Sequence, residues 1–341
     1  MSRAHLFFAI LVAVFSFTLP CPAQTDHTYK YFRVGNAADT AGTPHAGYAL
    51  MGGGADLDEA FTWLCDRAGG GGLLVLRATG TDAYNPYIQK LCRVNSVATL
   101  VIPNRDAAND SFVGSKIREA SAIFISGGDQ AHYINFWMGT PVQAALNEAI
   151  ARRVPMGGTS AGLAVLGEYA YSAQGDKPDD ADLSGKMAMG DPFSTRVTLA
   201  HGFLQIPALK GTITDTHFAK RDRMGRLLVF LARLNEADGK AVPPPGNNVR
   251  GIGVEQGAAV LVDSDGKATV VGHGDAYFVS ARGASGVLEA GKPLTFGPYA
   301  VAKVAPGGRF DLRAWSGEST NYVLTVHAGV IESTQPGGAV Y

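Results

Sequence analysis

Short apolar segments alternate with amphipathic segments through the first half of the chain. Nearly continuous apolar runs predict buried strands at 48–51, 73–76, 97–102 and 123–125. Apolar residues at helical spacing predict helices at 56–64, 87–94, 112–119 and 142–153, the first with Asp56 as its N-cap. Strands that are apolar on both faces and alternate with helices are typical of a parallel sheet covered by helices. The pattern therefore predicts an α/β fold with a doubly wound, mostly parallel sheet, whose site lies at the carboxyl ends of the strands.

The pattern changes after Ser172. Segment 174–182 is polar and acidic, and two interpretations remain open for it: a lid over a site, or a solvated loop. Helical spacing returns at 218–234, and 251–262 is interpreted as a buried strand pair or hairpin. Short alternating runs from Thr269 onward predict a small β-rich extension. We place a boundary near Leu288, so that residues 24–288 form the main α/β domain and residues 289–341 the C-terminal extension.

The first residues form a separate unit. Arg3 and His5 precede an apolar stretch from Leu6 to Leu19, and the small residue Ala23 closes the segment. A basic start, a short apolar run and a small residue are typical of a secretory signal peptide, here residues 1–23. The alternative is an N-terminal membrane anchor. We expect a secreted or periplasmic protein without stable membrane association once the signal is removed.

Composition and charge exclude several classes of function. The 341 residues are 46% hydrophobic, which suffices for a sizeable core. The 29 basic and 30 acidic residues nearly balance, and no basic run marks a nucleic-acid surface. The sequence contains no Cys-x-x-Cys or His-x-x-x-His spacing, so neither a metal site nor a cofactor is expected.

Two cysteines, Cys65 and Cys92, remain in the chain after the signal peptide. An oxidising compartment permits a disulfide between them, but the sequence does not show whether they meet. Both fall in segments with helical amphipathicity. We expect two buried free thiols.

The turn Gly158-Thr159-Ser160-Ala161-Gly162 carries the first chemical signal. Gly-x-Ser-x-Gly between a strand and a helix is the nucleophile-elbow pattern, in which a strained turn pushes the serine hydroxyl out of the sheet. The preceding strand is expected near 154–156 and the following helix at 161–169. The backbone N–H of Ala161, at the start of that helix, would donate to an oxyanion.

A nucleophilic serine needs a base, and His217 is the candidate. It is expected to begin a helix after an apolar turn at 211–214, with Asp215 and three arginines around it. Glu255, near the end of an apolar strand, would be the acid. The order serine, histidine, acid differs from that of α/β-hydrolases.

Three motifs together resemble a known family. Phe124-Ile125-Ser126-Gly127-Gly128-Asp129-Gln130, the Ser160 turn, and Asp215-Thr216-His217-Phe218 followed by Arg221, Arg223, Gly225 and Arg226 look like cyanophycinase. The resemblance spans roughly residues 47–262. It implies the serine peptidase family that includes dipeptidase E, on a flavodoxin-like fold similar to class I glutamine amidotransferases. Residues 24–288 would then be the catalytic peptidase domain.

The resemblance also implies a role for individual residues. Ser160 would be the nucleophile and His217 the base. The amides of Gly128 and Asp129, with that of Ala161, would form the oxyanion hole. Substrate-binding side chains would be Gln130, Asp215, Thr216, Arg221, Arg223 and Arg226. A homodimer is a further implication of the family.

The chain departs from the family pattern at two places. The family usually has glutamine where this chain has Thr216, and its triad acid falls on Gln256 rather than on Glu255. Neighbouring residues of a strand point to opposite faces, so the two are not interchangeable without a bulge. Either Glu255 reaches the histidine, or the neutral Gln256 orients it, or the enzyme is impaired.

Three hypotheses follow. The first is a secreted serine peptidase that cleaves cyanophycin (multi-arginyl-poly-aspartate) or related β-aspartyl peptides through an acyl-enzyme. The second is a peptidase of the dipeptidase E type, acting on acidic dipeptides. The third is a catalytically impaired peptide-binding protein on the same fold.

Overall fold

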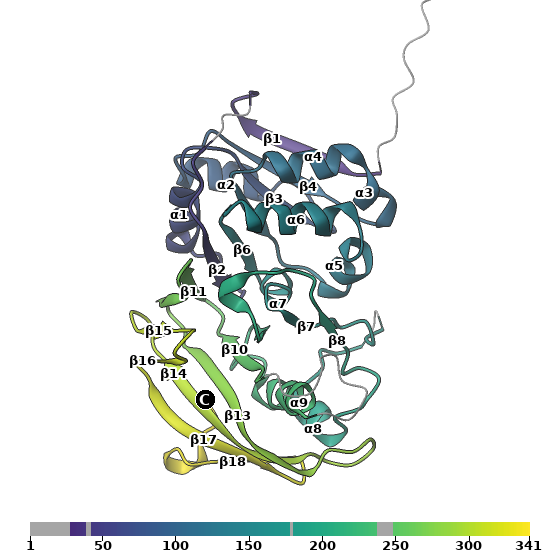
Figure 1. Cartoon of the computed structure of the whole chain (residues 1–341), viewed down its shortest axis with the longest axis vertical. Coiled ribbons are helices and arrows are strands. Elements are labelled where there is room, and N and C mark those ends of the chain that lie inside the picture. Colours follow the sequence, from purple (N-terminus) through teal and green to yellow (C-terminus); the bar gives the residue numbers. More distant parts are fainter. Residues whose placement is uncertain (1–27, 39–41, 178–179, 237–247) are drawn as a thin grey trace, which may run out of the picture.

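Two mixed sheets organise the chain. The computed structural model describes residues 28–341 except 39–41, 178–179 and 237–247, so the expected signal peptide at 1–23 lies outside the described residues. The parallel strands and helices α1–α6 occupy one half of the molecule, in the upper part of Figure 1. The C-terminal strands occupy the other half, and α7 lies between the two halves (Figure 1). The chain is therefore a mixed α/β protein with a β-rich C-terminal region.

The first sheet has ten strands in the order β1-β4-β3-β5-β6-β2-β11-β12-β15-β16. Its five central strands are parallel, and the outer ones are antiparallel to them or to one another. The bounds are β1 Lys30–Gly35, β2 Gly47–Met51, β3 Leu73–Arg77, β4 Ser96–Val101, β5 Ala122–Ile125, β6 Met156–Thr159, β11 Ala258–Asp263, β12 Lys267–Gly272, β15 Arg309–Asp311 and β16 Ser316–Gly317.

Helices cover both faces of the parallel strands. One buried cluster joins the strands to α1 and α2, and a second joins them to α4, α5 and α6. The bounds are α1 Asp58–Arg67, α2 Tyr84–Leu91, α3 Arg105–Asn109, α4 Ser111–Glu119, α5 Gln130–Trp137, α6 Pro141–Ala151 and α7 Ala161–Ala164. The strand order of flavodoxin would be β3-β2-β4-β5-β6 here, whereas β2 lies at the far side of β6. Parallel strands under helices are thus confirmed, and the flavodoxin-like order is not.

The second sheet has eight strands in the order β18-β17-β14-β13-β10-β9-β7-β8. Its bounds are β7 Tyr169–Tyr171, β8 Leu199–His201, β9 Thr212–Asp215, β10 Arg250–Val254, β13 Ala276–Val287, β14 Thr295–Val304, β17 Thr320–His327 and β18 Val330–Ser333. Helices α8 (Gly185–Gly190) and α9 (Met224–Asn235) lie beside it (Figure 1), and 3₁₀ turns occupy Pro207–Leu209 and Pro336–Gly338. The expected β-rich extension is present.

Several local predictions were wrong. The helix expected at 161–169 ends at Ala164, because Tyr169 already enters β7. The segment expected as a turn at 211–214 is strand β9, and the helix expected from 218 begins only at Met224. The N-cap of α1 is Leu57, whereas Asp56 accepts a hydrogen bond from the Tyr84 hydroxyl at 3.1 Å.

The strands within 251–262 are not a hairpin. Strand β10 pairs with β9 and β13 in the second sheet, whereas β11 pairs with β2 and β12 in the first. The chain thus crosses from one sheet to the other through Glu255, Gln256 and Gly257, and Gly257 takes a φ of 68°. The strand pair exists, but each strand has its partners elsewhere.

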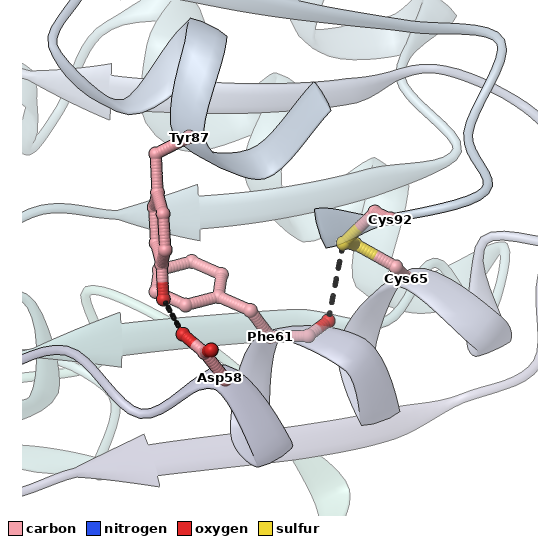
Figure 2. The surroundings of a disulfide bond; sticks show 5 residues. All are labelled: Asp58, Phe61, Cys65, Tyr87 and Cys92. Atoms are coloured by element: carbon pink, nitrogen blue, oxygen red, sulfur yellow. Dashed lines mark hydrogen bonds between the residues drawn. A yellow bond between two sulfur atoms is a disulfide. The ribbon is translucent and has the colours of Figure 1, made fainter. Parts of the chain in front are cut away.

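The expectation of free thiols was also wrong. Cys65, in the last turn of α1, forms a disulfide with Cys92, which follows α2, with Cα atoms 5.9 Å apart (Figure 2). The Cys92 sulfur lies 3.7 Å from the Phe61 carbonyl oxygen. Packing α1 against α2 on one face of the sheet brings the two side chains together, which no helical pattern reveals.

The expected domain boundary falls between paired strands. Strands β13 and β14 lie on either side of Leu288 and are antiparallel partners. The division into residues 24–288 and 289–341 stays a prediction.

None of the described helices has the length and apolar character to cross a bilayer. Within the same residues, no group of three or more His, Cys, Asp or Glu side chains is placed to hold a metal ion.

Candidate active site

Five loops meet at the carboxyl ends of strands from both sheets. Loops after β2, β5 and β6 come from the parallel part of the first sheet, and those after β9 and β10 from parallel strands of the second. Carboxyl ends of parallel strands are where α/β folds place their sites. The loops carry the three sequence motifs and, in addition, Gly52-Gly53-Gly54.

The Ser160 turn is a tight bend between β6 and α7. Ser160 has φ 52° and ψ −120°, a conformation that costs a non-glycine residue about 1–3 kcal/mol and persists only where neighbours impose it. A Cβ at Gly158 would lie 2.6 Å from the Gly162 backbone, and one at Gly162 would lie 2.0 Å from the Ile125 carbonyl oxygen. Both glycines are therefore required for the bend to fit against itself and against the end of β5.

The loop after β5 lies beside the serine. A Cβ at Gly127 would be 3.5 Å from the Ser160 Cβ, and Gly128 takes a φ of 151°. The buried Tyr133 hydroxyl donates to the Ser126 and Gly127 carbonyl oxygens, at 2.8 and 3.2 Å. Asp129 is the N-cap of α5 and accepts from the Ala131 N–H at 2.8 Å. The loop thus holds its backbone next to the hydroxyl with its carbonyls turned toward Tyr133.

The His217 turn follows β9 and is also strained. His217 has φ 47°, and its N–H donates to the Gly52 carbonyl oxygen at 2.8 Å. The imidazole lies directly over Gly53, where an added Cβ would be 2.4 Å from the ring carbon Cε1. Gly53 itself takes a φ of 97°. The Gly52-Gly53-Gly54 loop therefore packs against the imidazole of His217.

Ser160, His217 and Gln256 form a continuous hydrogen-bonded row. The Ser160 Oγ is 2.7 Å from His217 Nε2, and the Gln256 amide is 2.6 Å from His217 Nδ1. Either end of the amide can face the ring after a half-turn of the group. If the oxygen faces Nδ1, the proton sits on Nδ1 and Nε2 is free to accept the serine proton. If the nitrogen faces Nδ1, Nε2 carries the proton and the ring is not a base toward Ser160.

Glu255 occupies a different place. Its carboxylate accepts hydrogen bonds from the backbone N–H groups of Ala219, Lys220 and Gln256, the last two at 3.0 and 2.7 Å. These bonds tie the crossing between the sheets to the turn that follows His217. The structure thus brings Gln256 to the imidazole, and Glu255 to the backbone behind it.

The electrostatic environment of His217 keeps the ring neutral. Burial, together with the nearby Arg221 and Arg223 guanidinium groups, lowers its pKa from 6.5 to about 4. The side chain is 6% exposed. A neutral imidazole at neutral pH is the state that a general base requires.

A polar cleft of about 550 Å³ opens in front of Ser160. Nine of the residues singled out from the sequence line it: Gly128, Asp129, Gln130, Ser160, Ala161, Thr216, Arg221, Arg223 and Arg226. The segment after β7 also lines it, through Gln174, Asp176, Lys177, Asp180, Asp182 and Leu183. Part of the segment left open as lid or loop therefore borders the site.

Asp215 is not available in this cleft. It is 2% exposed and forms a double hydrogen bond with the buried Arg226, one of the two contacts at 2.8 Å. Its Oδ1 also accepts from the Thr216 N–H at 2.8 Å. An arginyl group of a ligand would have to displace Arg226, so this pair serves to fix the loop after β9.

Comparisons with known proteins point to the family that the sequence motifs resemble. The family model described as peptidase family S51 matches residues 50–190, which include the Ser160 turn. The cyanophycinase of Trichormus variabilis is 28% identical over 63% of this chain and 65% of its own length. These matches support the cyanophycinase and dipeptidase E-like peptidase family for this chain. The resemblance read from the three motifs is thus confirmed at the level of the family.

Two further similarities accompany that match. The cyanophycinase of Synechococcus elongatus is 25% identical over 79% of this chain and 80% of its own length. The match to the Trichormus relative spans slightly less than two thirds of that protein. A crystal structure of a peptidase from an acI-B1 Actinobacterium covers 86% of this chain and 98% of its own chain at 15% identity, with a TM-score of 0.45. A structural similarity with this TM-score adds nothing to the fold already described.

Two contributors to the site were not among the sequence candidates. Gly53 supports the His217 ring, and its signal was the triple glycine at the end of a buried strand. Asp182 contacts Arg221 and Arg223 from a segment without periodicity, and no pattern pointed to it.

Proposed function

We propose that this chain is a secreted serine hydrolase that acts through an acyl-enzyme on Ser160. The row Ser160–His217–Gln256, at 2.7 and 2.6 Å, is the observation that carries the proposal. A hydroxyl paired with a neutral imidazole, which a third group orients, is the general arrangement of an activated nucleophile.

The steps follow from the positions of the side chains. His217 Nε2 takes the proton of Ser160 Oγ as the hydroxyl attacks the scissile carbonyl. The Gln256 amide oxygen accepts from Nδ1–H and holds the required tautomer. The amides of Gly128, Asp129 and Ala161 stabilise the oxyanion. His217 then gives the proton to the leaving amine, and water hydrolyses the acyl-enzyme by the same route.

The substrate class is proposed from the charges of the cleft and from the family. Cyanophycin and related β-aspartyl peptides present both carboxylate and guanidinium groups. The cleft presents arginines together with Asp129, Asp176 and Asp180. Gln130 and Thr216 would add polar contacts, and a planar guanidinium of the protein would pair with a substrate carboxylate. Acidic dipeptides, as for dipeptidase E, are the alternative substrate, and parallel assays with polymer and a dipeptide library separate the two.

Secretion belongs to the same proposal. The Cys65–Cys92 disulfide supports it, because disulfides form and persist in oxidising compartments such as the periplasm or the extracellular space. The signal peptide at 1–23 would direct the chain there.

The test compares wild type, Ser160→Ala and the matched control Ser115→Ala, which changes a serine of helix α4. Wild type and the control should label with a fluorophosphonate and release β-aspartyl-arginine from cyanophycin, whereas Ser160→Ala should do neither. We expect a loss of about 10⁶-fold in kcat for Ser160→Ala, as for removal of a serine nucleophile in general. Equal turnover by Ser160→Ala and wild type would end the proposal.

A specific observation favours the impaired binding protein as the second candidate. As it stands, the Gln256 Nε2 faces His217 Nδ1, which corresponds to the tautomer without a free Nε2. Failure of Ser160 to react with the fluorophosphonate, with peptide binding retained, would support that function.

A further inference from the structure

Asp182 lies where a ligand carboxylate would bind. It follows β7 and precedes α8, and one oxygen, Oδ2, accepts from Arg221 Nη1 at 2.7 Å and from Arg223 Nη2 at 2.8 Å. The Asp182 side chain is 57% exposed, whereas that of Arg223 is 7% exposed. An exposed carboxylate thus covers a buried cation at the border of the cleft.

The buried guanidinium of Arg223 is only partly satisfied. Its Nη1 donates to the Thr216 carbonyl and hydroxyl oxygens, both at 3.0 Å, which fixes the plane of the group. Its Nε is buried and has no hydrogen-bond partner among the described residues. Nε and Nη2 form one edge of a guanidinium, the edge that binds a carboxylate with two parallel hydrogen bonds. Asp182 uses half of that edge.

Arg226 shows the complete form of this contact a few residues away. Its Nε and Nη2 both bond to Asp215, which is buried and is not displaced without breaking the fold of the loop. Asp182, by contrast, approaches from the solvent side on a loop, and among the described residues its Oδ2 contacts Arg221 and Arg223 alone.

Asp182 remains ionised in this position. Burial alone would raise its pKa, but the Arg223 and Arg221 guanidinium groups outweigh burial and hold the pKa below its ordinary value. The carboxylate therefore competes as an anion with any other anion for the two arginines.

We propose that Arg221 and Arg223 form a carboxylate subsite that Asp182 occupies in the free protein, and that a ligand carboxylate binds by displacing Asp182. The bound group would be a side-chain or terminal carboxylate of a peptide. It would take both Nε and Nη2 of Arg223. Asp182 then sets the affinity for acidic ligands, because every carboxylate must displace it before it can bind. The inference rests on the proposed function only in taking this cleft as the substrate site.

The experiment measures binding without turnover. Succinate is the probe and succinamide its neutral counterpart, with affinities from titration calorimetry on wild type, Asp182→Asn and Asp106→Asn. Asp106→Asn removes the same charge from an exposed position of helix α3 that does not line the cleft. We expect Asp182→Asn to bind succinate roughly tenfold more tightly, the change that corresponds to the loss of one competing charged contact. Asp106→Asn should change the affinity less than about twofold, and succinamide binding should not respond to either substitution.

Three outcomes would overturn the inference. Weaker succinate binding by Asp182→Asn would mean that Asp182 orders the arginines rather than competing with a ligand. An equal gain in Asp106→Asn would mean that the effect is one of net charge. An unchanged succinate affinity in Asp182→Asn would mean that the arginines bind no carboxylate. Thermal unfolding of each variant reports on folding, and Asp182→Ser is the second variant if Asp182→Asn is unstable.

Kinetic measurements show which carboxylate of the substrate binds to Arg221 and Arg223. If the enzyme cleaves β-aspartyl-arginine, Asp182→Asn should lower KM with little change in kcat, and amidation of either carboxylate of the peptide shows which of the two binds. If no peptide is cleaved but succinate behaves as expected, the proposed function fails and the carboxylate subsite stands. If peptides are cleaved and succinate affinity does not respond, the subsite fails alone.

Discussion

At the scale of single residues, a neutral amide takes the place next to the imidazole that a carboxylate usually takes. A carboxylate stabilises the imidazolium that forms during proton transfer, whereas an amide only holds the tautomer. With Gln256 there, burial and the arginines outweigh the opposing effect of Asp182 and Asp215, and the pKa of His217 falls to about 4. The base is fully neutral at pH 7, and it is a weak one.

The substitution Gln256→Glu tests this directly. In wild type, kcat/KM should be level from neutral pH down to about 5 and fall as His217 becomes protonated near pH 4. A carboxylate at the amide position favours the charged ring and raises its pKa, so the acid limb should move to higher pH by about one unit or more. The pH profile of kcat/KM measures the shift.

The matched control is Gln205→Glu, which adds the same charge at an exposed position outside the cleft. Its acid limb should coincide with that of wild type. An unchanged limb in Gln256→Glu would show that Gln256 does not act on the ring that limits the rate.

Sequence reasoning identified both neighbours, Glu255 and Gln256, but could not choose between them. Adjacent residues of a strand point to opposite faces, and the choice depends on which face the strand turns toward the histidine. That orientation is set where the chain leaves β10 for the other sheet and Glu255 binds the turn behind His217. The decisive contacts are between segments far apart in the chain, so no local pattern contains them.

At the scale of secondary-structure elements, the disulfide joins α1 to the end of α2 across one face of the sheet. Figure 2 shows Phe61 and Tyr87 beside it, and the Tyr87 hydroxyl donates to Asp58 at 2.6 Å. The rings of Phe61 and Tyr87 meet edge to face with centroids 5.6 Å apart. The disulfide thus fixes two helices that already contact one another.

Removal of this disulfide should destabilise the fold. Cys65 and Cys92 are 27 positions apart, and closing a loop of this size constrains the unfolded chain by about 3–4 kcal/mol. We expect a reductant, or the double variant Cys65→Ala/Cys92→Ala, to lower the free energy of unfolding in urea by roughly that amount. The double variant in the same reductant is the control, since it should not respond further. Alkylation of both thiols in the untreated folded protein would contradict the disulfide.

The elements that the sequence predicted well are those with a continuous local signal. Strands β2 to β5 are almost entirely apolar, because helices bury both of their faces, and their positions were predicted to within about a residue or two. The helix at 218–234 was predicted six residues too long at its start. His217 and Asp222 both adopt positive φ values there, and the Phe218 side chain is buried for a reason unrelated to helical spacing. A Cβ at Gly253 would touch its ring at 2.6 Å, so Phe218 is packed against β10.

At the scale of the whole molecule, the candidate site is shared between the two sheets. Ser160 comes from the first sheet, His217 from the second, and Gln256 from the crossing between them. The site therefore depends on how the sheets are held together. Many strands of the second sheet come from the C-terminal part of the chain, so this region supports the site although it contributes none of its reacting groups.

Tyr341 provides a specific link of this kind. Its hydroxyl accepts from the Met224 N–H at the start of α9 and donates to Asp222 Oδ1, both at 2.9 Å. Its ring meets Phe218 and Tyr277 edge to face, with centroids 6.0 and 5.8 Å away. The side chain thus connects the end of the chain to the turn that carries His217, Arg221 and Arg223.

The substitution Tyr341→Phe keeps the ring contacts and removes the hydroxyl. Met224 is fully buried, so its N–H would lose its acceptor, which costs about 1–3 kcal/mol. We expect the free energy of unfolding to fall by that amount. If the hydroxyl also holds the turn in place, kcat should fall while labelling of Ser160 slows in proportion, because the imidazole is then less often aligned with the serine.

Tyr322→Phe is the matched control: its hydroxyl donates to the Val340 carbonyl oxygen at 2.8 Å and does not contact the turn. If both variants lose stability but kcat changes only in Tyr341→Phe, the C-terminal region helps to position the site. If neither stability nor kcat changes in Tyr341→Phe, the two regions are coupled by other contacts.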